Sequence, residues 1–258
     1  MNDFVNMSIL ITGGAGYIGS HVVEEFVNKK CDVIILDNLI TGHKRLINPK
    51  ANFIKGDINN KKLVNNILKQ YNVRTIVHLA AYLSVSEAEK NKLKYRNNNI
   101  KGTKCLLSAC KNSNVKNFIF SSSCSIYGNV KGSVNEKKKP NPQGYYAYTK
   151  FKGEELIKQY AIKYKFRYAI LRYFNVAGAS SSGKIGQIQS NDQLIKNIAI
   201  QFFKKKPIIN IFGSDYPTRD GTCVRDYIHV SDLADIHIKG LDYLESNKKS
   251  YILNCGYG

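Results

Sequence analysis

Three glycines spaced three residues apart constrain the fold of this chain more than any other feature. Gly13, Gly16 and Gly19 follow the apolar run 8–12 and precede a stretch with the pattern of a helix. Gly13 permits a tight turn out of a strand, Gly16 lets a ligand approach the backbone, and Gly19 lets the helix pack close to the strand. The N–H groups at the start of the helix then face a bound phosphate. The stretch therefore predicts a turn that binds the pyrophosphate of a dinucleotide.

The alternative is an ordinary glycine-rich turn, and a second apolar run argues against it. Residues 32–37 form this run and end in Asp37, 18 positions after Gly19. A carboxylate at about this spacing binds the ribose hydroxyls in dinucleotide-binding folds. The two runs together favour a bound dinucleotide.

Up to residue 172 the chain alternates short apolar runs with helical patterns, which is typical of a doubly wound parallel sheet. The expected strands are 8–12, 32–37, 52–58, 75–81, 118–123 and 168–172. The expected helices are 21–29, 60–70, 97–112 and 146–164. We therefore predict an α/β protein with a Rossmann-type doubly wound parallel sheet over residues 1–175 and a smaller C-terminal substrate domain over residues 176–258.

Polar and small residues follow the expected strands at the edge where such sheets bind ligands. We expect Asp57, Ser123 and Asn175 to meet the glycine turn in one cleft, and the small pair at 80–81 to leave room for a flat cofactor. Asp57 also suits the N-cap of the following helix. His78 suits a core histidine whose hydrogen bonds are satisfied.

A candidate base lies in the expected helix 146–164. Tyr146 and Lys150 are four positions apart, which places them on one face of the helix. A phenol titrates near ~10, so it must lose about three pKa units, roughly 4 kcal/mol, to act as a base near neutral pH. A nearby lysine and a positively charged nicotinamide stabilise the phenolate. Ser123 can hydrogen bond the same substrate oxygen.

The spacing alone is ambiguous, because Tyr148 and Lys152 are also four residues apart. We prefer Tyr146 and Lys150 because Thr149 precedes the lysine, as in the pattern Tyr-x-x-Ser/Thr-Lys. Decoration of a helix surface remains the alternative in a chain with 17 tyrosines.

The composition limits the class of protein. The chain has 258 residues, 43% of them hydrophobic, which is enough for a sizeable core. No apolar stretch approaches the ~20 residues of a membrane span, and the N-terminus lacks the pattern of a secretory signal. Six scattered cysteines without a C-x-x-C pair indicate neither a metal site nor disulfides. We expect a cytoplasmic protein with reduced thiols.

The net charge of +20 raises the question of a nucleic-acid or membrane partner. The lysines are dispersed along the chain, and no nucleic-acid-binding motif is present. We therefore predict neither partner, although the charge can favour an anionic substrate.

The chain resembles the UDP-glucose 4-epimerases, a family of the extended short-chain dehydrogenase/reductase superfamily. The resemblance extends from residue 8 to the end of the chain. The stretches that carry it are residues 13–21, 36–39, 56–58, 78–81, 98–99, 102–103, 120–128, 146–150, 171–179, 211–213, 215–218, 221–230 and 254–258. The resemblance implies bound NAD, a UDP-sugar substrate and a homodimer formed through the two long helices. Those helices offer the apolar residues Leu106, Leu107, Leu156 and Ile157 for such a contact. The alternative is that these side chains face the sheet.

The resemblance also implies roles for individual residues. NAD would be held by Gly13, Gly16, Tyr17, Ile18, Gly19, Asp37, Asn38, Asp57, Ile58, Leu79, Ala80, Ala81, Asn99, Ser123, Tyr146, Lys150 and Phe174. The catalytic residues would be Ser123, Tyr146 and Lys150, with Tyr146 as the base. The substrate would be bound by Ser123, Tyr146, Asn175, Leu194, Phe212 and Arg225.

The implied reaction interconverts UDP-glucose and UDP-galactose by transient oxidation at C4, without net redox. The alternatives are another NAD-dependent nucleotide-sugar epimerase or dehydratase and a non-catalytic NAD-binding remnant. Related dehydratases carry Thr-Asp-Glu where this chain has residues 123–125, Ser-Cys-Ser, which argues against dehydration.

The sequence departs from the family at four places. Where the family has Gly-Glu-x-His, this chain has Gln187 in place of the glutamate and Gln189 in place of the histidine. Tyr145 replaces a proline before the catalytic tyrosine, and Lys196 replaces another proline. The family also continues for several dozen residues beyond the stretch 254–258. The substrate domain is therefore expected to be incomplete.

Overall fold

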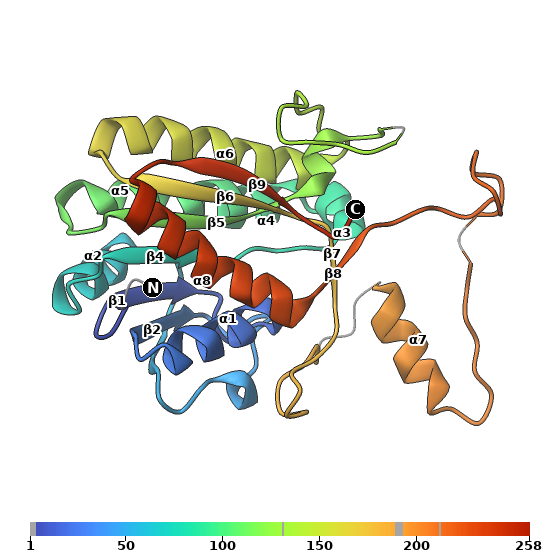
Figure 1. Ribbon diagram of the computed structural model, residues 1–258, viewed down its shortest axis with the longest axis horizontal. Coiled ribbons are helices and arrows are strands. Elements are labelled where there is room, and N and C mark those ends of the chain that lie inside the picture. Colours follow the sequence, from blue (N-terminus) through green and yellow to red (C-terminus); the bar gives the residue numbers. More distant parts are fainter. Residues whose placement is uncertain (1–3, 131, 189–192, 212) are drawn as a thin grey trace.

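The computed structural model describes residues 4–130, 132–188, 193–211 and 213–258. Its centre is a parallel sheet of seven strands in the order β3-β2-β1-β4-β5-β6-β9 (Figure 1). These strands are β1 (Ser8–Thr12), β2 (Asp32–Asp37), β3 (Asn52–Lys55), β4 (Thr75–His78), β5 (Asn117–Ser123), β6 (Arg167–Tyr173) and β9 (Tyr251–Cys255). All six neighbouring pairs are parallel, so the predicted Rossmann-type sheet is confirmed.

Helices cover both faces of the sheet, as a parallel sheet requires. On one face, α1 (Tyr17–Asn28) and α8 (Val230–Asn247) pack against Ile9, Ile35 and Leu171. On the other face, α2 (Lys61–Gln70), α5 (Thr103–Ala109) and α6 (Tyr145–Tyr164) pack against Leu10, Ile34 and other strand residues. Successive residues of each strand enter opposite cores, which explains why the strands read as continuous apolar runs.

Short helical segments complete the sheet layers. They are the 3-10 helices η1 (Lys44–Leu46), η3 (Cys110–Asn112) and η4 (Cys124–Tyr127), the α-helices α3 (Val85–Lys90) and α4 (Lys92–Tyr95), and the π-helix η2 (Arg96–Gly102). The helix predicted over 97–112 is therefore three segments, η2, α5 and η3, and a π turn is a feature that apolar periodicity does not reveal. The strands predicted over 52–58 and 75–81 end three residues earlier, because their last residues turn into the cleft.

The apolar residues proposed for a dimer surface lie inside the protein instead. Leu106, Leu107 and Ile157 are completely buried in the core beneath α5 and α6, and Leu156 packs against the same core. That part of the prediction is wrong, because these side chains face the sheet.

The C-terminal region divides into two parts. The strands β7 (Asn175–Ala177) and β8 (Tyr227–His229) form a separate parallel pair. The helix α7 (Leu194–Phe202) comes between these two strands in the sequence. In Figure 1, α7 and the adjoining loop extend away from the sheet, and the helix buries none of its residues. In contrast, α8 packs beside α1, and β9 pairs with β6. Part of the segment 176–258 thus belongs to the sheet layers, while the domain boundary at residue 175 stays a prediction.

Within the described ranges, no helix has both the length and the apolarity that crossing a bilayer requires. In the same ranges, no three His, Cys, Asp or Glu side chains converge as the ligands of a metal ion would.

Candidate active site

Two of the three glycines are required by the protein's own packing. Gly13 adopts a φ of +76°, and a Cβ there would lie 2.7 Å from the backbone nitrogen of Ala80. A Cβ on Gly19 would overlap the carbonyl oxygen of Gly13. These contacts let the turn cross close to the end of β4 and let α1 start directly above β1.

Gly16 is different, because the protein around it leaves space. Its backbone is extended, and a Cβ would come within 3.4 Å only of the Gly13 carbonyl oxygen, at 3.2 Å. Gly16 is also the N-cap residue of α1 and makes no side-chain cap. The first turn of a helix has N–H groups without intrahelical partners, so this position fits the phosphates of a dinucleotide.

Asp37 lies at the end of β2 and is tied to the glycine turn. Its Oδ2 accepts a hydrogen bond from Ala15 N at 3.1 Å, and its Oδ1 accepts one from Leu39 N at 2.8 Å. Burial raises the pKa of this carboxyl, while the two backbone hydrogen bonds oppose the rise. The side chain is thus held at the rim of the turn, where a ribose carboxylate is expected.

A cleft opens beside Asp37 at the carboxyl edge of the sheet. It is lined by Gly13, Leu36, Asp37, Asn38, Ile40, Thr41, Gly56, Ile58, Ala80, Ala81, Tyr82 and Asn98. Six of these residues are among those predicted to bind NAD. Sequence reasoning missed the other six, which are Leu36, Ile40, Thr41, Gly56, Tyr82 and Asn98. Ile40, Thr41, Gly56 and Tyr82 lie in the loops just after β2, β3 and β4, a position that could have signalled them.

Asp57 lies two residues after the end of β3 and is bonded to Asn38, a residue that lines the cleft. Its Oδ2 accepts from Asn38 Nδ2 at 3.0 Å, and its Oδ1 accepts from Asn59 N at 2.8 Å. Burial alone would raise the pKa of Asp57, but these hydrogen bonds outweigh it and lower the pKa. The alternative N-cap role is wrong, because Asn60 accepts from Leu63 N and caps α2.

His78 is the satisfied core histidine that was expected. Its Nδ1 and Nε2 each lie 2.8 Å from a threonine hydroxyl, those of Thr12 and Thr103. Complete burial lowers its pKa to about 3, so the ring is neutral.

Asn99 lies in the π-helix and is 4% exposed. Its Oδ1 accepts from Tyr82 N at 3.0 Å, while its Nδ2 donates to Tyr82 O at 3.1 Å and to Thr149 Oγ1 at 3.2 Å. Both donors of the amide are therefore used within the protein. In this structure Asn99 joins the loop after β4 to α6, and its predicted contact with NAD stays a prediction.

Three other predicted cofactor residues also contact the protein. Ile18 and Leu79 pack against the hydrophobic core. The hydroxyl of Tyr17 donates to the carbonyl of Gly178 at 2.7 Å, which joins the start of α1 to the segment after β7.

The predicted catalytic residues come together where α6 begins above β5. Tyr146 is half-buried, and the Ser123 hydroxyl lies close enough to its phenol to lower the phenol pKa. Lys150 is 3% exposed, and its Nζ donates to the Ser121 carbonyl at 2.7 Å and lies 6.0 Å from the centre of the Tyr146 ring.

Burial acts on both titrating groups of this constellation. It raises the pKa of Tyr146 to about 12, partly offset by the nearby Ser123 hydroxyl, and lowers the pKa of Lys150 to about 7. The lysine therefore carries a proton that it can lose or gain near neutral pH.

The other register of the Tyr-x-x-x-Lys pattern points outward. Tyr148 is 39% exposed, and Lys152 forms an ion pair at 2.7 Å with Glu155 on the same helix. This pair decorates the helix surface, whereas Tyr146 and Lys150 face the sheet.

The residues predicted to bind the substrate are less completely assembled. Asn175 is exposed, and its Nδ2 donates to the Asp226 carbonyl at 2.8 Å, beside the half-buried Phe174. Arg225 is exposed, and its Nη1 donates to the carbonyl of Val224 at 2.9 Å. Leu194 is half exposed at the start of α7. Phe212 lies outside the described residues.

Comparison with known proteins identifies the family of the chain. Residues 9–256 match the NAD dependent epimerase/dehydratase family. A UDP-glucose 4-epimerase of Lactobacillus helveticus is 43% identical over 252 residues, which cover 97% of this chain and 76% of that protein. The chain thus spans about three quarters of the length of this relative.

Solved structures are similar over the same length. A UDP-glucose 4-epimerase from Brucella ovis in complex with NAD superposes with a TM-score of 0.91 at 35% identity, covering 97% of this chain and 77% of that one. A UDP-Glc/GlcNAc 4-epimerase from Campylobacter jejuni superposes with a TM-score of 0.83 at 37% identity, covering 98% and 79%.

Proposed function

The chain belongs to the NAD dependent epimerase/dehydratase family, and within it we propose that the chain interconverts UDP-glucose and UDP-galactose as a UDP-glucose 4-epimerase. The observation that carries the proposal is the grouping of Ser123, Tyr146 and Lys150 at the carboxyl edge of the sheet. The names of the similar proteins favour the same substrates.

Tyr146 is the base in this proposal. Its phenolate accepts the proton of the sugar 4-hydroxyl, and Ser123 holds the same oxygen by a hydrogen bond. When bound, NAD would supply both the acceptor and the donor of the hydride at C4, and a positively charged ring that favours the phenolate. The proton then returns from Tyr146 to the reduced sugar oxygen.

Lys150 makes this proton transfer feasible near neutral pH. A buried phenol with a pKa of about 12 is a poor base unless a positive charge stabilises its anion. The Lys150 ammonium, 6.0 Å from the ring centre, provides that charge. We propose Ser123, Tyr146 and Lys150 as the catalytic residues on these grounds.

We propose that NAD lies along the cleft, with its pyrophosphate at Gly16 and a ribose at Asp37. The space around Gly16 and the position of Asp37 beside the turn support this placement. The proposed set remains Gly13, Gly16, Tyr17, Ile18, Gly19, Asp37, Asn38, Asp57, Ile58, Leu79, Ala80, Ala81, Asn99, Ser123, Tyr146, Lys150 and Phe174.

The substrate would extend from Tyr146 toward the β7–β8 pair. Asn175 and Arg225 flank this direction, and an exposed guanidinium suits a diphosphate because it offers paired N–H donors. Leu194 and Phe212 complete the proposed substrate set, together with Ser123 and Tyr146.

We further propose a cytoplasmic homodimer. The six cysteines are free, which suits a reducing compartment. The outer surface of η2 and α6 has a hollow lined by Arg96, Ile100, Tyr145 and Tyr148, and the neighbouring Leu93 is 67% exposed. Sedimentation should give twice the chain mass of 29.1 kDa, and a monomer at micromolar concentration would contradict the proposal.

The direct test is incubation with UDP-galactose and NAD, with detection of UDP-glucose by chromatography. We expect conversion in both directions without net formation of NADH. A folded sample that binds NAD but converts no UDP-sugar would show a non-catalytic NAD-binding protein. UDP-N-acetylglucosamine belongs in the same assay, because one similar structure is that of a UDP-Glc/GlcNAc 4-epimerase.

A further inference from the structure

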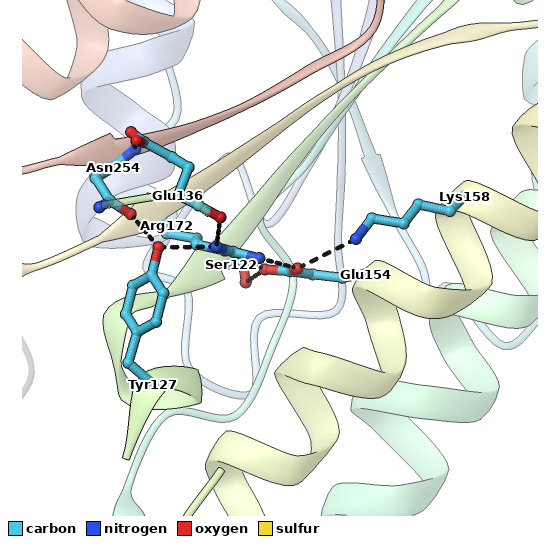
Figure 2. Close-up of polar contacts among 7 residues, drawn as sticks. All are labelled: Ser122, Tyr127, Glu136, Glu154, Lys158, Arg172 and Asn254. Atoms are coloured by element: carbon cyan, nitrogen blue, oxygen red, sulfur yellow. Dashed lines mark hydrogen bonds and ion pairs between the residues drawn. The ribbon is translucent and has the colours of Figure 1, made fainter. Parts of the chain in front are cut away.

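A buried ion pair joins the helix that carries Tyr146 and Lys150 to strand β6. Arg172 donates from Nε to Glu154 Oε1 at 3.0 Å and from Nη2 to Oε2 at 2.8 Å. Glu154 lies in α6, four residues after Lys150, and is completely buried, while Arg172 is 2% exposed. Figure 2 shows the two side chains meeting between the helix and the sheet. The reaction proposed above uses neither of them.

The same helix is also fixed to β5 at successive residues. Lys150 donates to the carbonyl of Ser121, and Ser122 Oγ donates to Glu154 Oε1 at 2.6 Å. Ser123, the next residue of the strand, contacts the catalytic phenol. A shift of α6 along β5 would therefore alter all of these contacts together.

On its other side, the guanidinium contacts the loop that follows β5. Arg172 Nη1 donates to the Tyr127 hydroxyl at 2.8 Å, and that hydroxyl donates to Asn254 Oδ1 at 2.7 Å (Figure 2). Asn254 N in turn donates to Glu136 Oε1 at 2.7 Å. The network thus links α6, β6, β9, η4 and Glu136 through directional bonds.

The pair cannot be explained by stability alone. Both charges lose their water on burial, so apolar side chains of similar size often stabilise a fold equally well. Apolar contacts such as those of Ile157 and Ala161 are not directional, whereas a bidentate guanidinium–carboxylate pair fixes both distance and orientation. The distinct contribution of the pair is therefore geometric.

We infer that Glu154 and Arg172 are positioning residues, whose ion pair fixes α6 against β5 and β6 and keeps Lys150 and Tyr146 at the distances that proton transfer requires. This inference rests on the proposed epimerase function. It predicts that the pair acts on kcat and its pH dependence, and only weakly on substrate binding.

The other titratable groups around Lys150 and Tyr146 do not supply the positive charge. They are His78 of β4, Tyr95 of α4, Cys124 of η4 and Tyr173 of β6. Burial lowers the histidine pKa to about 3, raises the Cys124 pKa to about 11 and raises both tyrosine pKa values, so all four are neutral near pH 7. A change in the pH profile would thus report on the lysine and the phenol.

The test replaces the pair by apolar residues in the double variant Glu154→Leu/Arg172→Met of the full chain. We expect circular dichroism and NAD binding like those of the unsubstituted chain, at least a tenfold lower kcat, and a KM for UDP-galactose within threefold. The pH profile of kcat should shift to higher pH, because the lysine no longer holds its position near the phenol. A folded double variant with unchanged kcat and pH profile would overturn the inference.

Glu155→Gln is the matched control, because it removes an exposed ion pair one residue further along the same helix. It should leave kcat, KM and the pH profile unchanged. If the double variant fails to fold, Ser122→Ala decides, since it removes only the hydroxyl on Glu154 Oε1. We expect a three- to tenfold lower kcat with the same pH shift, and an unchanged enzyme would overturn the inference.

A second measurement separates this inference from the proposed function. Carbon-13 NMR of ε-labelled lysines, assigned with Lys150→Met, measures the pKa of Lys150 without any turnover. Loosening α6 should admit water and raise that pKa by at least half a unit in the double variant, but not in Glu155→Gln. A chain that converts no UDP-sugar would refute the function, whereas an unchanged Lys150 pKa in the folded variants would refute the positioning role.

Discussion

Helices α7 and α8 both belong to the C-terminal region, yet the protein uses them in opposite ways. α7 has the sequence LIKNIAIQF and is the more apolar of the two, but it buries no residue. α8 carries more charged residues and buries eight positions, including Leu233, Leu241 and Leu244, against α1 and the sheet. The apolar content of a helix therefore does not decide whether it is buried, because burial needs a partner surface.

The two regions also hold different parts of the proposed site, the catalytic residues in one and two of the substrate-binding residues in the other. The candidate base and its partners lie on the sheet layers that α8 and β9 help to complete, whereas Leu194 lies on α7 and Arg225 on the segment that returns from it. The predictions below test whether the two regions contribute in these different ways.

The largest effect is expected at the base. Tyr146→Phe removes the group that transfers the proton, so kcat should fall about a thousandfold, within the range for general acid–base catalysis. NAD binding, followed by fluorescence titration, should remain. Tyr148→Phe is the matched control on the outer face of the same helix and should stay within twofold. If Tyr148→Phe loses activity and Tyr146→Phe does not, the base is Tyr148 and the assignment to Tyr146 is wrong.

The second prediction compares the two helices directly by stability. Leu241→Ala opens a cavity in the core beneath α8 and should lower the free energy of unfolding by about 2–5 kcal/mol. Ile200→Ala on α7, where the side chain is 43% exposed, should change it by no more than about 0.5 kcal/mol. Urea denaturation measures both. Equal losses would show that α7 is covered in solution.

The third prediction concerns recognition by the outer segment. Arg225→Gln removes a charge assigned to the substrate diphosphate, so KM for UDP-galactose should rise about tenfold with kcat nearly unchanged. Arg219→Gln changes an exposed arginine of the same segment and serves as the control. If Arg225→Gln lowers kcat as strongly as Tyr146→Phe does, the arginine takes part in catalysis and not only in substrate binding.

The smallest expected effect is a dependence of the free energy of unfolding on pH, which comes from Lys150 in the sheet region. Burial lowers the pKa of Lys150 to about 7, while an unfolded lysine titrates near about 10.4. Between these values the unfolded chain binds the extra proton, so this group makes stability rise with pH, by at most about 1.4 kcal/mol per pH unit. Below pH 7 both states are protonated and the slope vanishes.

Urea denaturation between pH 6 and 9 measures how the free energy of unfolding changes with pH. Lys150→Met should remove the part of this change that the lysine contributes. The buried thiols, whose raised pKa values act in the opposite direction at higher pH, are common to both proteins and cancel in the difference. Parallel pH curves for the two proteins would show that the lysine is not buried in solution.

The sequence by itself determined the sheet and the cleft. Glycine spacing predicts the turn because Gly13 and Gly19 leave no room for a Cβ, and uninterrupted apolar runs predict strands buried on both faces. The position of Asp37 followed from its spacing of 18 residues after Gly19, because the end of the second strand has a fixed place in a βαβ unit.

Tertiary structure alone decided three other matters. It showed that Tyr148 and Lys152, the register the sequence disfavoured, lie on the outer face of α6. It placed Glu154 and Arg172, 18 residues apart, in one buried pair that no local pattern encodes. It also added β9 to the sheet beside β6 and left α7 without a buried residue, because a strand or helix acquires its partner from the whole fold and not from its own sequence.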